Sequence, residues 1–249
     1  MSLACGGGGG GSDSSFALDA CSAVASRSYE PRLINGESCS RDSSSVVLIR
    51  ATDLFDGEII CSATAISSDA VLTAAHCITA LSTSVSVETG SQSFPAISTK
   101  RHPQYRESSS NTSLLFDVAV VKTASPLGVP AVPMLVSRRA QAGEEAIIAG
   151  FGLDESGSAE SFKAGNMIVS EVTNDHVIAQ FNGEGSNTCV GDSGGPLLVQ
   201  NQGVFVIAGV TSTGVREDCG VGDISLFASL ENAANSSFII EQVRDASLQ

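Results

Sequence analysis

Eleven short apolar runs, separated by polar turns, occupy most of the chain after Arg32. Each run has four to eight residues, and several alternate between apolar and polar positions as half-buried strands do. They lie at residues 46–50, 59–66, 70–73, 85–88, 118–122, 146–149, 167–172, 177–181, 196–199, 204–210 and 224–230. A helical pattern occurs near the C-terminus, where Phe238, Ile239, Ile240 and Val243 share one face. We therefore expect an all-β fold, as one barrel or two, followed by a C-terminal α-helix.

Charge and cysteine content narrow the classes of function. The formal net charge of −14 argues against a nucleic-acid partner, because phosphates would be repelled. No apolar run approaches the roughly 18 residues of a membrane helix. The seven cysteines are well separated and contain no Cys-x-x-Cys pair, a pattern that favours disulfides in an oxidising compartment over a zinc site. We expect no metal and no cofactor.

The first 32 residues differ in composition from the rest of the chain. Cys5 is followed by six glycines and then by Ser and Asp, a composition typical of a flexible tether, which we assign to residues 1–15. A cysteine before such a tether resembles the start of a mature bacterial lipoprotein, with the lipid on Cys5; a plain low-complexity tail is the alternative. Residues 16–32 are interpreted as a pro-segment. The expected location is outside the cytoplasm, either secreted or held at the cell envelope by the lipid alone.

A stretch from Thr188 to Pro196 places one serine, Ser193, among three glycines and beside an acid. Glycine allows backbone angles and close approaches that a side chain forbids, so the turn can present both a hydroxyl and bare N–H groups. Acyl transfer needs that pair, a nucleophile and donors for an oxyanion. The same residue types also make ordinary surface loops, and that reading stays open for this stretch alone.

Three histidines and one aspartate are the candidates for the other catalytic roles. His76 follows a predicted strand among small residues and precedes Cys77, whereas His102 and His176 lie at turns and are interpreted as structural. Asp117 is bracketed by apolar residues, so a buried carboxylate there needs a partner, and a histidine N–H is a suitable one. A solvated aspartate at a strand end is the alternative.

The order of these residues separates enzyme classes. Residues 191–195 also match the G-x-S-x-G elbow of α/β-hydrolases, but that fold requires a histidine after the serine and none follows Ser193. A subtilisin-like order would need an aspartate before His76, such as Asp53 or Asp69, and the helices of that fold are missing. The observed order is His76, Asp117, Ser193.

Four segments in this order resemble the signature segments of trypsin-like serine proteases of the chymotrypsin family. They are Thr73-Ala74-Ala75-His76-Cys77, Asp117-Val118-Ala119-Val120-Val121, Gly150-Phe151-Gly152 and Gly191-Asp192-Ser193-Gly194-Gly195-Pro196. The resemblance extends over residues 33–249. It implies a peptidase domain of two six-stranded antiparallel β-barrels with the active site between them.

The resemblance also assigns roles. Ser193 is expected to attack the scissile carbonyl, His76 to take and return the proton, and Asp117 to orient His76. The backbone N–H groups of Gly191 and Ser193 are expected to form the oxyanion hole. The predicted activity is a serine endopeptidase acting on protein or peptide substrates, and the alternative is an inactive homologue that uses the barrels to bind a partner.

Arg32 and Leu33 resemble the activation site of the family. Cleavage between them by another protease would free the α-amino group of Leu33, which is expected to fold inward and pair with Asp192. An unpaired buried aspartate is costly, so this one cut reorganises the loop around Ser193. The chain is therefore predicted to be a zymogen.

The cysteines are paired by the same resemblance. Cys61 with Cys77 matches the disulfide of the histidine loop, and Cys189 with Cys219 matches the bridge beside the substrate pocket. We also propose a bond between Cys21 and Cys39, which would tie the pro-segment to the domain and leave Cys5 for lipid.

The same resemblance implies the pocket residues, through their positions relative to Ser193. Asn187 is expected at the base of the pocket for P1, the residue before the cut bond, where trypsin has an aspartate. Gly214 leaves one wall open, Ser225 narrows another, and Ser212 is expected to bind substrate. These residues predict an uncharged or apolar P1 side chain, although Asp218 and Asp223 on nearby loops are able to attract a basic one.

Overall fold

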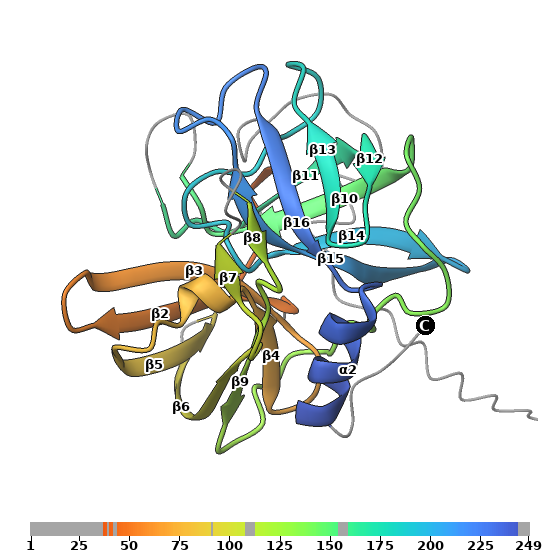
Figure 1. Ribbon diagram of the computed structural model, residues 1–249. Helices are drawn as coiled ribbons and strands as arrows, with labels where there is room; N and C mark the ends of the chain where they lie inside the picture. Colours follow the sequence, from red (N-terminus) through yellow and green to blue (C-terminus); the bar gives the residue numbers. More distant parts are fainter. Residues whose placement is uncertain are drawn as a thin grey trace, which may run out of the picture.

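The computed structural model of the protein describes residues 37–38, 40–41, 44–90, 92–107, 113–153 and 159–243. Between residues 46 and 123, six antiparallel strands close into a barrel in the order β2-β3-β4-β9-β6-β5 (Figure 1). We call it the first barrel. Its strands are β2 (Val46–Asp53), β3 (Gly57–Ala65), β4 (Ala70–Thr73), β5 (Ser82–Thr89), β6 (Gln92–Arg101) and β9 (Ala119–Thr123).

Eight strands form a second antiparallel sheet in the order β1-β11-β10-β14-β15-β16-β13-β12. They are β1 (Glu37–Ser38), β10 (Glu145–Gly150), β11 (Lys163–Ile168), β12 (Glu171–Val172), β13 (His176–Gln180), β14 (Pro196–Asn201), β15 (Val204–Gly214) and β16 (Ile224–Ser229). The chain passes from β11 to β12 through residues 169–170, although β11 is second in the order and β12 is last. The sheet therefore curls back on itself, and we call it the second barrel.

The predicted fold class, two β-barrels with a C-terminal helix, is confirmed. Helix α2 (Ala233–Gln242) is capped at its N-terminus by Asn232, whose side chain accepts a hydrogen bond from the N–H of Ala234 at 2.9 Å. Phe238 and Ile239 are buried as expected. Ile240 is 41% exposed, which corrects the predicted apolar face, since adjacent residues of a helix point about 100° apart.

The clearest differences from the predicted strands lie at β6 and at residues 167–172. Strand β6 was not predicted, because it lacks a continuous apolar run. The residues on its inward face are only partly buried. The predicted run 167–172 is divided between the end of β11 and β12. Its middle residues bind different neighbours: the N–H of Val169 donates to Glu144 O at 3.0 Å and that of Ser170 to Ile178 O at 2.8 Å. Apolar content alone does not reveal such a change of partner.

Two further elements flank the first barrel. A short hairpin pairs β7 (Arg106–Glu107) with β8 (Leu114–Leu115), and a 3-10 turn, η1 (Ala75–Cys77), follows β4. One apolar cluster continues from the first barrel into the second, where Ile147, Leu198 and Ile207 belong to it. Within the described residues, no helix combines the length and apolar character required to cross a bilayer.

Candidate active site

His76 is held at the end of β4 by contacts to one carboxylate. The preceding residues Thr73, Ala74 and Ala75 are small and fully buried, so the chain turns tightly into η1. The backbone N–H of His76 donates to Asp117 Oδ1 at 2.9 Å, and its ring Nδ1 lies 2.7 Å from Asp117 Oδ2. The second contact places the ring proton on Nδ1, which leaves Nε2 as the basic nitrogen.

Asp117 reaches this position from the turn between β8 and β9. Phe116 adopts φ +54°, an uncommon backbone conformation for a bulky residue, and the turn directs Asp117 inward, where it is 0% exposed. A third donor comes from the second barrel: the hydroxyl of Ser212, on β15, donates to Asp117 Oδ2 at 2.6 Å. A buried carboxylate with three donors is well compensated for the loss of water.

The disulfide between Cys61 and Cys77 contacts both His76 and the Ser193 loop. Cys77 Sγ is 3.8 Å from His76 Nε2 and 3.7 Å from the carbonyl oxygen of Ser193. Among the described residues, no hydrogen bond joins the Ser193 hydroxyl to the His76 ring. Cys61, His76 and Cys77 lie close enough to hold a metal ion, but both sulfurs are committed to the disulfide and supply no thiolate.

Both barrels anchor the Ser193 loop. The carbonyl of Ser193 accepts from the N–H of Ser62, on β3, and the N–H of Gly194 donates to Thr211 O, on β15, both at 2.8 Å. Gly194 has φ +84°, and a Cβ there would overlap Thr73 Oγ1 and Ser62 O. A glycine is therefore required at this position for the loop to reach the wall of the first barrel.

Gly191 and Ser193 present unbonded N–H groups. Gly191 has φ +96°, and its carbonyl is turned away to accept from the Ser62 hydroxyl at 2.9 Å. In the described part of the chain, neither the Gly191 nor the Ser193 N–H donates a hydrogen bond. Two free donors beside a serine hydroxyl are able to stabilise an oxyanion.

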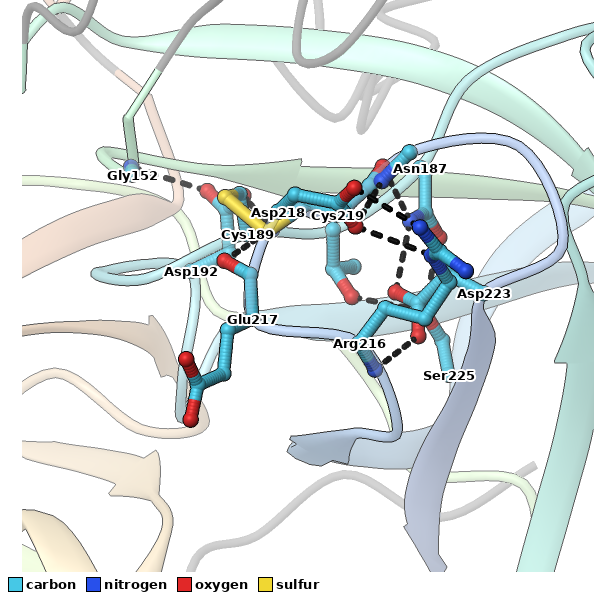
Figure 2. Close-up of a disulfide and its surroundings, with 12 residues drawn as sticks. Gly152, Asn187, Cys189, Asp192, Arg216, Glu217, Asp218, Cys219, Asp223 and Ser225 are labelled. Atoms are coloured by element: carbon cyan, nitrogen blue, oxygen red, sulfur yellow. Dashed lines mark hydrogen bonds and ion pairs between the residues drawn. A yellow bond between two sulfur atoms is a disulfide. The ribbon is translucent and has the colours of Figure 1, made fainter.

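Asp192 is buried below this loop at 1% exposure. Its Oδ1 accepts from the N–H of Gly152 and its Oδ2 from the N–H of Cys189, both at 2.9 Å (Figure 2). Burial raises the pKa of Asp192 to about 7, against the opposing effect of these two hydrogen bonds and of the Lys163 charge. The carboxyl group is thus close to the balance between its neutral and charged forms near pH 7.

The predicted pocket residues lie together around the second disulfide, Cys189–Cys219. Asn187 bonds to the carbonyl of Cys219 at 3.0 Å, and its Oδ1 accepts from the Ser225 hydroxyl at 2.8 Å. Asn187 and Ser225 are fully buried, whereas Gly214 is exposed. The side chain of Ser212 donates to Asp117, and its substrate-binding role remains a prediction.

Several predicted residues lie outside the described part of the chain. They are the activation residues Arg32 and Leu33 and the cysteines Cys5, Cys21 and Cys39. The cleavage site, the Cys21–Cys39 bond and the lipid on Cys5 remain predictions.

The other two histidines make contacts that involve neither His76 nor Asp117 among the described residues. His102 stacks on Phe116 and meets Phe238 edge-on, each at 4.9 Å between ring centroids, and burial lowers its pKa. The Nε2 of His176 lies 2.8 Å from the carbonyl of Leu114. Both rings occupy structural positions, as the sequence indicated.

Three polar side chains make contacts at the site that the sequence did not predict. Ser62 bridges the Ser193 loop and the adjoining strand end, since its hydroxyl also accepts from the N–H of Phe151 at 2.9 Å. Thr188 bonds to Ser225, and Asp223 bonds to Asn187, both at 2.8 Å. The sequence held weak signals for two of them, because Ser62 follows Cys61 and Thr188 follows Asn187.

Comparisons with known proteins show which family and which relatives this chain is similar to. Residues 33–236 match the family model described as Trypsin. Kallikrein-11 of Homo sapiens is 30% identical over 224 residues, which cover 77% of this chain and 74% of that protein. Phenoloxidase-activating factor 3 of Holotrichia diomphalia is 28% identical, over 62% of this chain and 56% of its own length. Vitamin K-dependent protein C of Mus musculus is 26% identical, over 77% and 47%. The chain thus spans most of the first relative and about half of the other two.

Proposed function

Because the chain belongs to the trypsin family and is a serine endopeptidase, we propose that His76, Asp117 and Ser193 are its catalytic triad. The observation that carries the proposal is the pair of hydrogen bonds from the N–H and ring Nδ1 of His76 to buried Asp117. They fix the ring with Nε2 available as a base.

The proposed reaction proceeds through an acyl-enzyme. Ser193 Oγ attacks the peptide carbonyl as His76 takes its proton, and the free N–H groups of Gly191 and Ser193 hold the oxyanion. His76 then returns the proton to the leaving amine, and water releases the acyl group by the same steps in reverse.

We further propose that the uncut chain is a zymogen activated between Arg32 and Leu33. The support is the state of Asp192, a buried carboxyl whose contacts are backbone N–H groups and whose pKa is raised to about 7. A new α-amino group at Leu33 would supply a full charge to pair with it. In this proposal residues 1–15 are a tether, residues 16–32 the pro-segment and residues 33–249 the peptidase domain.

The proposed partners follow from the proposed activity and from the proposed activation by cleavage. They are a protein or peptide substrate and an activating protease, and the two disulfides support a place outside the cytoplasm. Secretion or a lipid anchor on Cys5 is part of the proposal. The uncharged or apolar P1 preference remains the prediction from sequence.

Labelling with a fluorophosphonate probe tests the triad and the zymogen together. Cleavage after Arg32 is expected to raise the labelling of Ser193 strongly, and the variant Arg32→Gln, treated identically, is expected to stay unlabelled. The matched control is Arg139→Gln, a change at an arginine remote in sequence from the proposed cut. Full labelling of uncut protein would contradict the zymogen but support the triad. No labelling after the cut would favour the alternative, an inactive homologue that binds a partner.

A further inference from the structure

Asp117 lies at the centre of a three-residue turn. The N–H of Val118 donates to the carbonyl of Phe116 at 2.9 Å, and this bond closes the turn around the acid. Phe116 enters the turn with φ +54°, a left-handed backbone conformation that is disfavoured for a bulky side chain. Such a conformation persists only where the surrounding structure holds it.

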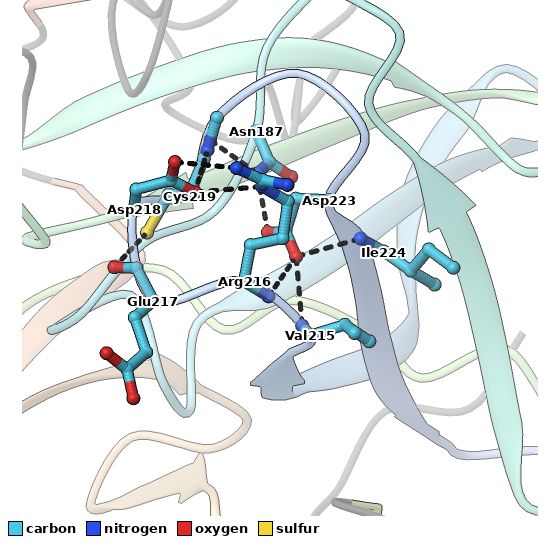
Figure 3. A network of polar contacts seen from close by, with 9 residues as sticks. Asn187, Val215, Arg216, Glu217, Asp218, Cys219, Asp223 and Ile224 are labelled. Atoms are coloured by element: carbon cyan, nitrogen blue, oxygen red, sulfur yellow. Dashed lines mark hydrogen bonds and ion pairs between the residues drawn. The ribbon is translucent and has the colours of Figure 1, made fainter.

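Among the described residues, the carboxylate of Asp117 accepts no hydrogen bond from its own turn. A second fully buried acid, Asp223, differs in this respect, because backbone N–H groups around it, including that of the next residue Ile224, donate to its Oδ1 at 2.8 to 2.9 Å (Figure 3). The donors to Asp117 are His76 and Ser212, which lie 41 and 95 residues away in the sequence. The carboxylate therefore stays on the His76 ring only as long as other contacts hold the turn.

His102 contacts this turn on both sides of the acid. Its backbone N–H donates to the carbonyl of Val118 at 2.9 Å. Its ring stacks on the ring of Phe116, with centroids 4.9 Å apart and planes inclined by 14°. One residue thus holds both neighbours of Asp117.

The imidazole of His102 is itself fixed and 4% exposed. Its Nδ1 accepts from the N–H of Gln104 at 3.1 Å, and its Nε2 lies 3.3 Å from the carbonyl of Ala234, on α2. Since a carbonyl only accepts, Nε2 carries the proton and the ring is neutral. Burial lowers the pKa of His102, against the opposing effect of the Ala234 carbonyl, which agrees with the neutral form. Phe238 of α2 meets the ring edge-on, so this helix supports the stack at two points.

The ring of Phe116 has a second charged-type partner. The guanidinium carbon of Arg106, on β7, lies over this ring at 5.3 Å from its centroid. A cation over an aromatic face is attracted by the ring quadrupole. The side chain of Phe116 is therefore held by an imidazole and by a guanidinium, which supports its uncommon backbone conformation.

The residues before the turn are held from the second barrel. His176, on β13, places its Nε2 2.8 Å from the carbonyl of Leu114. All three histidines of the chain therefore contact residues 114–118. A segment that is fixed before, at and after the turn leaves Asp117 little freedom to move.

We propose that the stacked pair His102 and Phe116 are positioning residues, which hold the Asp117 carboxylate on the ring of His76. The inference rests on the proposed function, in which Asp117 orients the base. The pair acts through Asp117 alone and takes no part in binding the substrate. It gives His102 a role in the reaction beyond the structural one expected from the sequence.

The test compares Phe116→Leu with Phe94→Leu, the same change at another partly buried ring of the first barrel, on β6. Both are cut like the unchanged protein, and fluorophosphonate labelling to completion counts the active sites. Phe116→Leu is expected to lower kcat per active site about 10- to 100-fold with little change in KM, the cost of a small misplacement of catalytic groups. Phe94→Leu is expected to leave kcat unchanged. An unchanged kcat in Phe116→Leu overturns this inference and leaves the triad standing, whereas unchanged protein that is neither labelled nor active overturns both.

The pH profile separates positioning from stability. A carboxylate close to an imidazolium stabilises the charged form, so a displaced Asp117 should move the rise of kcat/KM to lower pH, by about half a pH unit or more. A variant that is only less stable should lose labelled protein and keep the profile of the remainder, and that result for Phe116→Leu overturns the role. Phe116→Tyr keeps the ring and should keep both kcat and the profile. A loss as large as that of Phe116→Leu would show that the ring is not what matters.

A double-mutant cycle tests whether the two rings act together. His102→Leu removes the imidazole from the stack and should lower kcat to a similar extent as Phe116→Leu. For a pair that acts as a unit, the second change adds little to the first, whereas independent residues give losses that multiply. Multiplied losses overturn the paired role. Since replacement of buried His102 risks misfolding, the Phe116 variants supply the independent arm.

Discussion

The two barrels hold their acids in different ways. In the first barrel, Asp117 is bonded to the ring of His76, and a closed set of six strands fixes both. In the second barrel, Asp192 and Asp223 lie in loops and are held mainly by backbone N–H groups. We therefore expect the proposed base to be held in place by the fold, and the proposed nucleophile and pocket to respond to the charge of these two buried carboxyls.

The largest expected effect is in the first barrel. Asp117→Asn should leave the fold intact and lower kcat by roughly 10⁴-fold, the loss known for the corresponding change in this family, because the ring of His76 then adopts the wrong tautomer. Steady-state kinetics of the cut protein measure it. The control Asp56→Asn, in the exposed β2–β3 turn, should be unaffected. A loss under tenfold for Asp117→Asn would contradict its role.

The second effect concerns Asp192. A carboxyl whose pKa rises from 3.8 to about 7 on folding takes up a proton between these values, so it lowers stability as pH rises from about 4 to 7. Asp192→Asn should remove up to roughly 4 kcal/mol of this pH dependence. Urea unfolding of uncut Ser193→Ala protein with and without Asp192→Asn measures it. Equal slopes against pH in both proteins would show that Asp192 is not the group responsible.

The third comparison replaces each disulfide in turn. Cys61 and Cys77 are 16 residues apart and Cys189 and Cys219 are 30 apart, so paired substitution by Ala should cost about 3 and about 4 kcal/mol. Denaturant unfolding gives the two losses. The functional consequences should differ: loss of the first bond should lower the labelling rate of Ser193, and loss of the second should raise KM. Identical kinetic changes in the two disulfide variants would argue against separate functional roles for the two barrels.

The smallest effect tests the contact that crosses between barrels. Ser212→Ala removes a hydrogen bond of 2.6 Å to charged Asp117 and should lower kcat/KM about 10-fold. The matched control is Ser84→Ala, an exposed serine that bonds to Thr52 at 3.0 Å, which should change nothing. A Ser212→Ala enzyme with a normal kcat/KM would leave Asp117 wholly dependent on the first barrel.

Much of the fold was predictable because its information is local. Strand β4 was predicted at its observed bounds, since Ala70 to Thr73 form a compact buried run between polar turns. Strand β6 was missed, because its residues alternate between exposed and half-buried positions and its register comes from β5 and β9. The resemblance to trypsin-like proteases singled out His76, Asp117 and Ser193, but not the Ser62 hydroxyl that fastens the Ser193 loop.

The sequence by itself determined the strand-rich class, the family and the three residues proposed for the chemistry, because order and spacing along the chain carry that information. Only the tertiary structure decided what surrounds them. Asp223 is 36 residues from Asn187, and Ser212 is 95 residues from Asp117, yet each pair is hydrogen-bonded. Burial and the direction of a hydrogen bond depend on which groups meet in space, and a chain read in order does not show that.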